Sequence, residues 1–409
     1  MSPLIRYGLA TLVGLGLAAE LVVLNLADWA IRERRADALH VAAGFSPHAA
    51  AYAAEAALAA RRPVAAERLA RRALEGAPLS ARALRVYGLS LEARDDLAGA
   101  AAVMATAGGL GWRDTPTQVW LMDAYARQGD MGAALERADA LLRRGQFKEQ
   151  VRALFVHAAF DPNARAVVAQ RLAAGPVWRP YFFEAGRSLP TKWFDGYSLF
   201  LDHVAESGDQ VTPAEVEPFV DKLFQARNYA RARETWRRFA AARLAERGNA
   251  VLDGGFETSS LPSQAADAQH VSPFEWQFPQ APGTETALGE PPGREGERAL
   301  YVASAGNIRA EMASQALALA PGIYTLSIDT FAVPGTELKG FSWRVECLPE
   351  GQPLDLKNPT RSPEELSFRF EVPQDGCPGQ RLVLVAQSDY TAASSFWFDN
   401  VVINPVADL

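Results

Sequence analysis

Apolar positions recur with helical spacing from about residue 36 to residue 248. Alanine, leucine and arginine dominate this region, and short breaks containing Gly or Pro divide it into helix-length segments. After Gly145 the segments become richer in aromatic residues and Pro. The pattern predicts a succession of short α-helices whose final part is irregular.

The helical region repeats with a period of 34 residues. The small residue near the start of the second helix of each pair recurs at Ala66, Ala100 and Ala134. The turn between paired helices keeps the same spacing, at Arg61-Arg62, Asp95-Asp96 and Gly129-Asp130. A fixed period of this length predicts an α-helical solenoid over residues 36–248, in which each helix pair packs on the next.

The unit VWLMDAYARQGDMGAALERADALL (119–142) resembles the tetratricopeptide repeat. It carries Leu121, Tyr125, Gly129 and Ala134 at that family's spacing. The resemblance covers about a quarter of the chain and implies a surface that binds a protein partner, because such arrays serve mostly as docking surfaces.

The pattern changes at the stretch NAVLDGGFETSS (249–260), and a long Pro- and Gly-rich connection follows it. Later segments alternate apolar and polar residues with period two. In GIYTLSIDTF (322–331) the polar set includes Ser327 and Asp329, and in FSWRVEC (341–347) it includes Arg344 and Glu346. Short alternating strands separated by turns predict an antiparallel β-sandwich over residues 249–409. The fold class is therefore multidomain, α plus β.

The opening Gly-Gly-Phe-Glu and the closing FWFDNVVI (396–403) resemble the galactose-binding-like jelly rolls, a group that includes carbohydrate-binding modules. The resemblance implies that the first and last strands lie side by side. It also implies that Glu257 and Asp399 share a structural calcium ion. Two carboxylates would need backbone carbonyls to complete such a site, and two partly exposed acids near a turn are the alternative.

Both cysteines of the chain, Cys347 and Cys377, fall in the predicted sandwich. Two cysteines in one small all-β unit suggest a disulfide, and hence an oxidising compartment.

Residues 4–30 form the most hydrophobic segment of the chain. Between residues 7 and 26 its one charge is Glu20, and about 20 apolar residues suffice to span a bilayer. Trp29 and the run RERR (32–35) mark a polar boundary. We expect residues 1–35 to be a transmembrane anchor. A cleaved signal peptide or a buried soluble helix is the alternative.

Two features of the sequence predict opposite orientations for this anchor. The Arg residues at 32, 34 and 35 favour a cytoplasmic body by the positive-inside rule. The predicted disulfide and the extracytoplasmic habit of glycan-binding jelly rolls favour the periplasm, and we expect that location at a bacterial inner membrane.

Charge and motifs exclude several function classes. From residue 249 onward there are 21 Asp and Glu against 9 Lys and Arg, a net charge of −12. This balance argues against nucleic acid as a partner, since phosphate binding needs concentrated basic residues. The sequence has no nucleophile elbow, phosphate loop or zinc-ligand spacing, so we expect no enzyme, although a pair of glycosidase carboxylates stays open.

A sugar site would combine flat aromatic rings with fixed polar groups. If one face of a sheet is the site, its outward and loop residues give the candidates Trp276, Asp329, Arg344, Glu346, Gln387 and Tyr390. The alternative for Trp276 is that it pins the long loop to the sandwich.

Anchor, solenoid and jelly roll together suggest a non-catalytic, membrane-anchored periplasmic scaffold in cell-envelope or exopolysaccharide assembly or export. The solenoid would bind a protein partner and the jelly roll a polysaccharide. A purely protein–protein envelope assembly factor is the alternative, and a glycan-active enzyme is a third reading.

Overall fold

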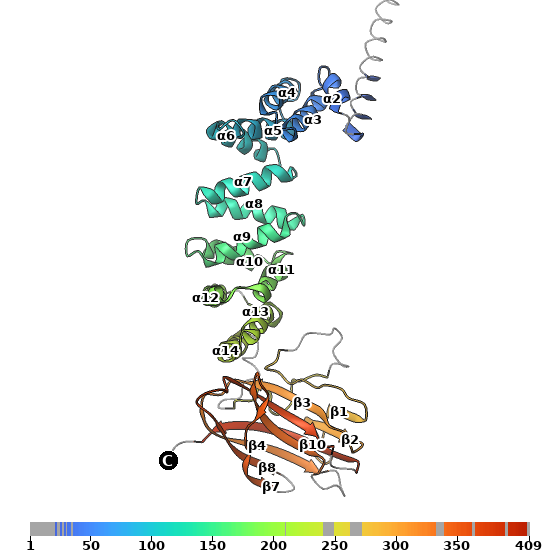
Figure 1. The fold of residues 1–409 in the computed structure, drawn as a ribbon, viewed down its shortest axis with the longest axis vertical. Coiled ribbons are helices and arrows are strands. Elements are labelled where there is room, and N and C mark those ends of the chain that lie inside the picture. Colours follow the sequence, from blue (N-terminus) through green and yellow to red (C-terminus); the bar gives the residue numbers. More distant parts are fainter. Residues whose placement is uncertain are drawn as a thin grey trace, which may run out of the picture. The chain divides into compact units, whose positions relative to one another are not determined.

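The chain forms an array of paired helices followed by a β-sandwich (Figure 1). The computed structural model describes residues 21–22, 25–26, 28–29, 31–33, 36–208, 210–239, 249–261, 272–332, 339–361, 365–388 and 392–406. Two compact units result, Met1–Trp178 and Arg179–Leu409. The last described helix ends at Phe239, residues 249–261 form bends and turns, and the first described strand begins at Thr284. The units divide earlier, so the last helices belong with the sandwich.

The first unit is built from consecutive antiparallel helices. They are α2 (Ala36–Ala42), α3 (Pro47–Ala59), α4 (Pro63–Gly76), α5 (Ala81–Glu92), α6 (Leu97–Gly109), α7 (Thr115–Arg127), α8 (Met131–Arg143), α9 (Lys148–Phe160) and α10 (Arg165–Ala173). Ala66, Ala100 and Ala134, the small residues of the repeat, are fully buried on α4, α6 and α8. A larger side chain there would separate the paired helices.

The turns within the pairs repeat the same backbone conformation. Arg61, Asp95 and Gly129, each 34 residues from the next, have positive φ angles of 58°, 64° and 79°. Asp96 and Asp130 are the N-caps of the following helices α6 and α8, and their carboxylates accept the backbone N–H three residues on, at 2.9 and 3.0 Å. The sequence period is therefore also a period of local geometry.

The second unit starts with short, aromatic-rich helices. These are α11 (Arg179–Phe183), the 3-10 turns η1 (Glu184–Ser188) and η2 (Thr191–Trp193), α12 (Phe194–Glu206), α13 (Pro213–Gln225) and α14 (Tyr229–Phe239). Tyr197, Phe183 and Phe219 are fully buried among them. The Tyr229 ring packs directly on Gly379 of the sandwich, where a Cβ atom would come within 2.5 Å of it. This packing gives a physical reason for grouping these helices with the strands.

The described residues of the sandwich contain ten strands. They are β1 (Thr284–Gly289), β2 (Ala299–Ser304), β3 (Ala310–Leu317), β4 (Gly322–Ala332), β5 (Phe341–Leu348), β6 (Gln352–Pro353), β7 (Lys357–Arg361), β8 (Glu365–Val372), β9 (Gly379–Ala386) and β10 (Ser394–Pro405). A six-stranded sheet has the order β1-β2-β10-β4-β8-β7, and a four-stranded sheet has the order β3-β9-β5-β6. All pairings are antiparallel, and the apolar residues of both inner faces fill the core between the sheets.

The opening stretch lies beside the last strand, as the jelly-roll resemblance implied. The Ala250 N–H donates to the Ile403 carbonyl at 3.1 Å, and the Val401 N–H donates to the Gly254 carbonyl at 3.0 Å. The Asn249 side-chain amide donates to the Val401 carbonyl at 3.0 Å, and its oxygen accepts from the Ile403 N–H at 3.1 Å. Residues about 150 positions apart are thus joined.

Cys347 at the end of β5 and Cys377 before β9 form a disulfide with a sulfur–sulfur distance of 2.03 Å. Within the described part of the chain, we find no helix with both the length and the apolar character that crossing a bilayer requires. Most of the predicted anchor segment, residues 4–30, lies outside the described residues.

The contact between Gly254 and β10 yields a matched pair of variants. A Cβ atom at Gly254 would lie 2.2 Å from the Val401 carbonyl oxygen, whereas one at Gly255 would meet its nearest neighbours at 3.7 Å. We predict that Gly254→Ala lowers the free energy of unfolding by about 1–3 kcal/mol, because backbone must move apart. Gly255→Ala should change it by less than about 0.5 kcal/mol. Equal effects of both variants in chemical denaturation would contradict the close approach.

Candidate functional site

The structure separates the residues predicted to form one sugar-binding face. Asp329 lies on β4 and points outward from the six-stranded sheet, while Arg344 and Glu346 lie on β5 and point outward from the four-stranded sheet. Gln387 follows β9, and its backbone N–H donates to the Gly340 carbonyl at 2.8 Å. Because the two outer faces lie on opposite sides of the core, these residues cannot share one site, and the predicted single face is corrected.

Trp276 is part of the core. It is 3% exposed, its Nε1–H donates to the Asp253 carbonyl at 2.9 Å, and its ring lies 5.0 Å from that of Phe256. Its indole has no open face on which a sugar could stack, so the alternative given for it, pinning the long loop, fits its position. Tyr390 lies outside the described residues.

Three aromatic residues lie side by side on the outer face of the six-stranded sheet. Trp397 on β10 is the cross-strand partner of Tyr301 on β2 and of Phe331 on β4. The rings of Tyr301 and Trp397 have centroids 5.1 Å apart, and all three side chains are partly exposed. We call Tyr301, Trp397 and Phe331 the aromatic row.

Strand parity explains why this row stands outside the core. Its neighbours along the strands, Leu300, Phe398 and Thr330, are at most 2% exposed and point inward. Gly289 on β1 lies beside Trp397, and a Cβ there would make an ordinary van der Waals contact with the indole at 3.6 Å. The aromatic row is therefore a set of three neighbouring rings on the outer surface, held in place by three adjacent strands.

Carboxylates occupy the next outward position on β10 and β4 and the position beside them on β8. Asp399 on β10 pairs with Asp329 on β4, and Asp329 pairs with Glu365 on β8. We call Asp399, Asp329 and Glu365 the acidic row. Beyond it, Ser327 and Ser367 pair with each other and add hydroxyl groups to the face.

A β-bulge shapes the end of the acidic row. The register of β10 against β4 shifts between Asp399 and Val402, and Asn400 there has a φ angle of 46°, a conformation that Asn tolerates. The Asn400 side-chain amide donates to Asp329 at 2.8 Å, and its backbone N–H donates to Asp399 at 2.7 Å. Asn400 thus donates hydrogen bonds to the carboxylates of both Asp399 and Asp329.

Asp399 is 6% exposed although it belongs to an outer face. Burial raises the pKa of its carboxyl to about 6, the Asn400 backbone N–H opposes this, and the nearby carboxylates of Asp329, Glu257 and Glu297 raise it further. Like charges directly opposite across a sheet are destabilising. The surroundings of Asp399 therefore disfavour the ionised form of its carboxyl group.

The predicted calcium ligands lie close together. Around Gly255, a Cβ atom would lie 3.7 Å from Asp399 Oδ1, 3.7 Å from Glu257 Cγ and 3.9 Å from Asn400 Oδ1. Oxygen donors of this kind suit calcium, which takes six to eight of them. Within the described segments, no group of three or more His, Cys, Asp or Glu side chains gathers as a metal site. Calcium at this position stays a prediction.

The outer face of the four-stranded sheet is built differently. Arg381 on β9 lies 2.9 Å from Glu311 on β3 and 3.6 Å from Glu346 on β5. One arginine thus pairs with a glutamate on each of its two neighbouring strands. Glu346, predicted as a sugar ligand, is thus engaged in an ion pair within the fold.

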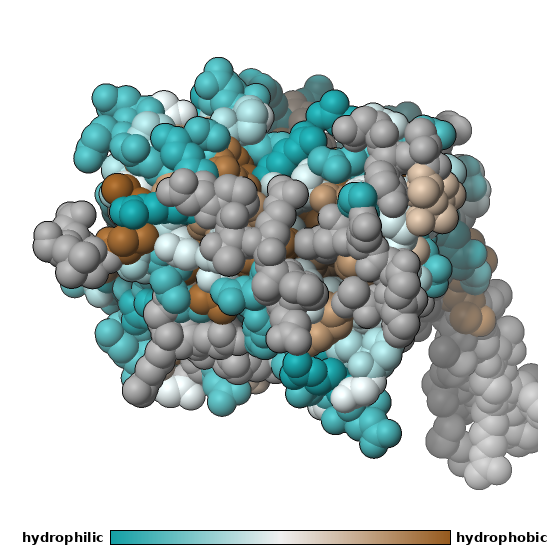
Figure 2. Space-filling model, turned by 90° about the horizontal axis from the view of Figure 1, so that it is seen from below, coloured by the Kyte–Doolittle hydropathy of each residue, from teal (hydrophilic) through white to brown (hydrophobic). Residues whose placement is uncertain are grey.

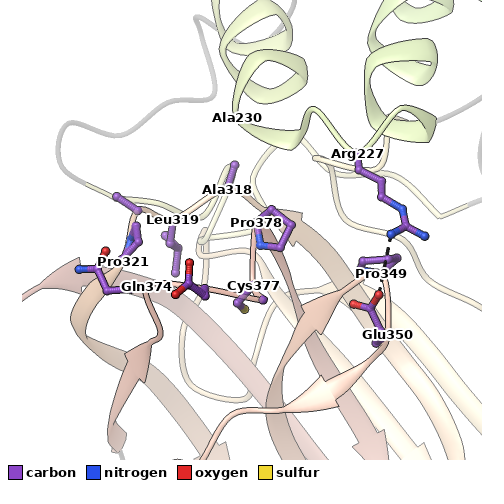
Figure 3. A pocket seen from close by; sticks show the side chains of 13 residues that line it. Arg227, Ala230, Ala318, Leu319, Pro321, Pro349, Glu350, Gln374, Cys377 and Pro378 are labelled. Atoms are coloured by element: carbon purple, nitrogen blue, oxygen red, sulfur yellow. Dashed lines mark ion pairs between the residues drawn. The ribbon is translucent and has the colours of Figure 1, made fainter.

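Loops at one end of the sandwich form a pocket of about 670 Å³ with the turn between α13 and α14 (Figure 3). Its lining includes Leu319, Pro321, Pro349 and Cys377. Figure 3 shows Arg227 of the helical turn directed at Glu350, with 3.9 Å between nitrogen and oxygen. Both side chains are more than half exposed, so the pair contributes little stability. The pocket is best described as a seam between helices and loops.

In the first unit, partly exposed aromatic and charged side chains cross the first helices of successive pairs. The Arg82 guanidinium lies 3.8 Å from the Tyr52 ring centre, which links α5 to α3. The Trp120 Nε1–H donates to Glu92 at 2.9 Å, which links α7 to α5. Beneath them the buried Arg85 pairs with Glu55 and Asp114, both at 2.6 Å. We call Tyr52, Arg82, Glu92 and Trp120 the array stripe.

Sequence reasoning missed the aromatic row, although the signal was present. FWFDNVVI was used for the family resemblance, and the alternation within it places Trp397 opposite in parity to Phe396 and Phe398. The partners Tyr301 and Phe331 could not be found this way, since they join the row only through the order of strands in the sheet.

No protein-family model matches the chain, and no curated protein matches it. Among solved structures, the CBM22-1 xylan-binding domain of Paenibacillus barcinonensis Xyn10C is 14% identical over 33% of this chain and 87% of that domain, with a TM-score of 0.25. A CBM4 structure is 16% identical over 38% of this chain and 99% of its own, with a TM-score of 0.23. PilF of Pseudomonas aeruginosa is 16% identical over 49% of this chain and 77% of its own, with a TM-score of 0.25. These likenesses are too distant to carry a functional assignment.

The raised pKa of Asp399 makes a prediction about stability. The group has a pKa of 3.8 when free and about 6 in the fold, so the folded state binds the proton more tightly. Stability from this group is therefore present below pH 3.8 and lost as the pH rises to about 6. We predict that Asp399→Asn, which cannot ionise, raises the melting temperature at pH 7.5 in a chelator but not at pH 4.

Asp355→Asn is the matched control, because the Asp355 side chain is 79% exposed. It should change the melting temperature at neither pH. A gain for Asp399→Asn of the same size at pH 4 would contradict the electrostatic origin. If calcium is bound as predicted, adding it at pH 7.5 should stabilise the unchanged protein and leave Asp399→Asn unaffected.

Proposed function

We propose that this protein is a non-catalytic, membrane-anchored periplasmic scaffold in cell-envelope or exopolysaccharide assembly or export. In this proposal the β-sandwich binds a glycan, the helical array binds a protein partner, and residues 1–35 anchor the chain in a bacterial inner membrane.

The aromatic row is the observation that carries the glycan part. Sugar rings have apolar C–H faces bordered by hydroxyl groups, so they bind to aromatic rings flanked by polar side chains. Trp397 and Tyr301 supply such rings, and Asp329, Asn400 and Ser327 lie in the following rows. Viewed from below, the sandwich surface is largely hydrophilic, with hydrophobic side chains exposed between polar ones (Figure 2).

The array stripe supports the protein-binding part. Aromatic and arginine side chains are enriched among residues that dominate protein interfaces. Tyr52, Arg82 and Trp120 supply both types on the first helices of three successive pairs. A partner segment lying along the array could contact all three pairs at once.

The disulfide supports the periplasmic part of the proposal. Disulfides persist in oxidising compartments and are rare in the cytosol. Cys347 and Cys377 are both 6% exposed in the sandwich, so the bond has a structural position rather than that of an exposed reactive thiol.

A purely protein–protein assembly factor is the second candidate. It is favoured by the partial burial of the aromatic row, since half-covered rings also serve as protein contacts. Glycan binding by the protein distinguishes it from the first proposal.

The glycan part predicts a loss of binding on removal of the central ring. We expect full-length protein to bind neutral hexasaccharides such as cellohexaose, xylohexaose or the N-acetylglucosamine hexamer in calorimetry. Trp397→Ala should weaken that binding about tenfold or more, because the stacking surface is lost.

Arg344→Gln on the opposite sheet is the matched control and should bind unchanged. Weakening by Arg344→Gln together with normal binding by Trp397→Ala would move the site to the four-stranded sheet. Absence of any glycan binding would favour the protein–protein factor.

Cellular location makes a separate prediction. In intact cells, Cys347 and Cys377 should react with a thiol reagent only after reduction, because the disulfide forms in the periplasm. The measurement is labelling by a membrane-impermeant maleimide, with and without reductant, followed by denaturation. Two free thiols that the reagent reaches only after lysis would place the body in the cytoplasm.

A further inference from the structure

Large apolar side chains are exposed at the turns that lead into the first helix of each pair in the first unit. They are Phe45 before α3, Leu79 before α5, Trp112 before α7 and Phe147 before α9, with exposed fractions of 75%, 77%, 41% and 45%. They follow one another at intervals of 34, 33 and 35 residues, close to the repeat period. Because neighbouring helices are antiparallel, the turns before α7 and α9 lie at one edge of the array, and those within the pairs lie at the other (Figure 1). We call these four residues the turn row.

Phe147 occupies a position where the fold favours a different residue. It is the N-cap of α9, yet its ring cannot accept the backbone hydrogen bond that an Asn or Asp side chain would accept there. Its φ angle is 51°, in the left-handed region that Gly and Asn adopt most readily. A bulky side chain in that region costs free energy, and such outliers gather at functional sites. A ring that is nearly half exposed at this position therefore points to a ligand outside the fold.

Exposed basic side chains accompany the turn row. They lie in, next to or in contact with the same turns, and they are Arg72, Arg113, Arg144 and Lys148. Arg72 on α4 donates to the Gly44 carbonyl at 2.8 Å, and Arg144 donates to the Trp112 carbonyl at 3.0 Å. These bonds hold two guanidinium groups beside the turns of Phe45 and Trp112. Positive charge thus lies next to apolar side chains along the row.

The opposite edge of the array differs in charge. The turns within the pairs hold charges of both signs, including Arg61, Arg62, Asp95, Asp96, Asp130 and Asp161. Beside the turn row, Asp114 and Glu149 are each paired with an arginine at 2.6 Å, and Glu75 near the end of α4 is an exposed acid. Both edges expose apolar side chains, since Leu97 at the opposite edge is 64% exposed. The edge with the turn row is the one where exposed positive charge predominates.

From this pattern we infer that the turn row lies on the membrane surface and that its basic neighbours bind the phosphate groups of anionic lipids. The inference rests on the proposed membrane anchor, because Phe45 lies ten residues beyond the end of that anchor at residue 35. Aromatic and other apolar side chains insert at the level of lipid headgroups, where arginine and lysine are attracted by anionic lipids. Lipid is preferred to a protein partner because the row begins beside the anchor, where the bilayer is the nearest surface.

The test uses full-length protein in lipid vesicles, with an environment-sensitive fluorescent probe at one introduced cysteine. Labelling is specific because both natural cysteines form the disulfide. Leu79→Cys places the probe in the turn row, and Leu97→Cys places it at the opposite edge. In phosphatidylcholine vesicles that contain phosphatidylglycerol, a nitroxide-labelled lipid should quench the Leu79 probe about twofold or more and leave the Leu97 probe unchanged. Quenching should weaken in phosphatidylcholine alone and at high salt, because salt screens exposed charges.

Two further changes separate lipid contact from folding. In the Leu79→Cys protein, Phe147→Asn should reduce the quenching and leave the melting temperature unchanged or higher, because Asn tolerates the left-handed conformation and caps the helix. Arg113→Gln should also reduce the quenching, because one basic group beside the lipid phosphates is lost. Arg127→Gln is its matched control, since Arg127 is exposed at the opposite edge, and it should leave the quenching unchanged.

Vesicle flotation of the same samples separates this inference from the proposed function. If the protein floats with the vesicles but the Leu79 probe is not quenched, the inference is overturned and the anchor stands. Equal quenching of both probes, or equal quenching with and without phosphatidylglycerol, would also overturn it, because lipid contact would then not depend on the turn row or on its charge. If the protein does not float, the membrane anchor of the proposed function fails, and the inference fails with it.

Discussion

The pairing of the opening stretch with the last strand governs the sandwich and its candidate site. The backbone of Gly254 approaches Val401 so closely that no side chain fits between them. This contact joins the opening stretch to β10 beside the bulge that contains Asn400. It also brings Glu257, from the start of the domain, beside Asp399, near its end. The contact therefore adds Glu257 to the carboxylates that the register of β10, β4 and β8 already places side by side.

The two outer faces of the sandwich hold their carboxylates in different ways. On the four-stranded sheet, Arg381 lies between Glu311 and Glu346 and pairs with both. On the six-stranded sheet, Asp399 and Asp329 oppose each other, and a single asparagine donates to both. An arginine between them would stabilise the sheet and fill the face. Like charges opposed across strands cost stability, which is one reason why the pKa of Asp399 is raised.

Much of the architecture could be predicted from the sequence because it depends on local periodicity. Ala66, Ala100 and Ala134 recur every 34 residues because each must fit the same crossing of paired helices. Alternation in β4 and β5 correctly separates Leu326 and Val345, in the core, from Asp329 and Arg344, on the surface. Alternation cannot say which sheet a strand joins, since that follows from pairings between distant segments. For this reason Asp329 and Arg344 were assigned to one face although they lie on opposite faces, and the neighbours Tyr301 and Phe331 were missed.

The same reasoning explains why the aromatic row is a better basis for function than any single exposed ring. Trp112 and Trp29 are each more than 40% exposed, but they lie on single helices or turns of the first unit. Tyr301, Trp397 and Phe331 come from three strands whose registers are fixed by backbone hydrogen bonds and by the core beneath. Their spacing is therefore determined before any ligand binds, so little conformational entropy is lost on binding. Three rings held in register on adjacent strands therefore form a preformed surface on which a flat, partly apolar ligand can stack.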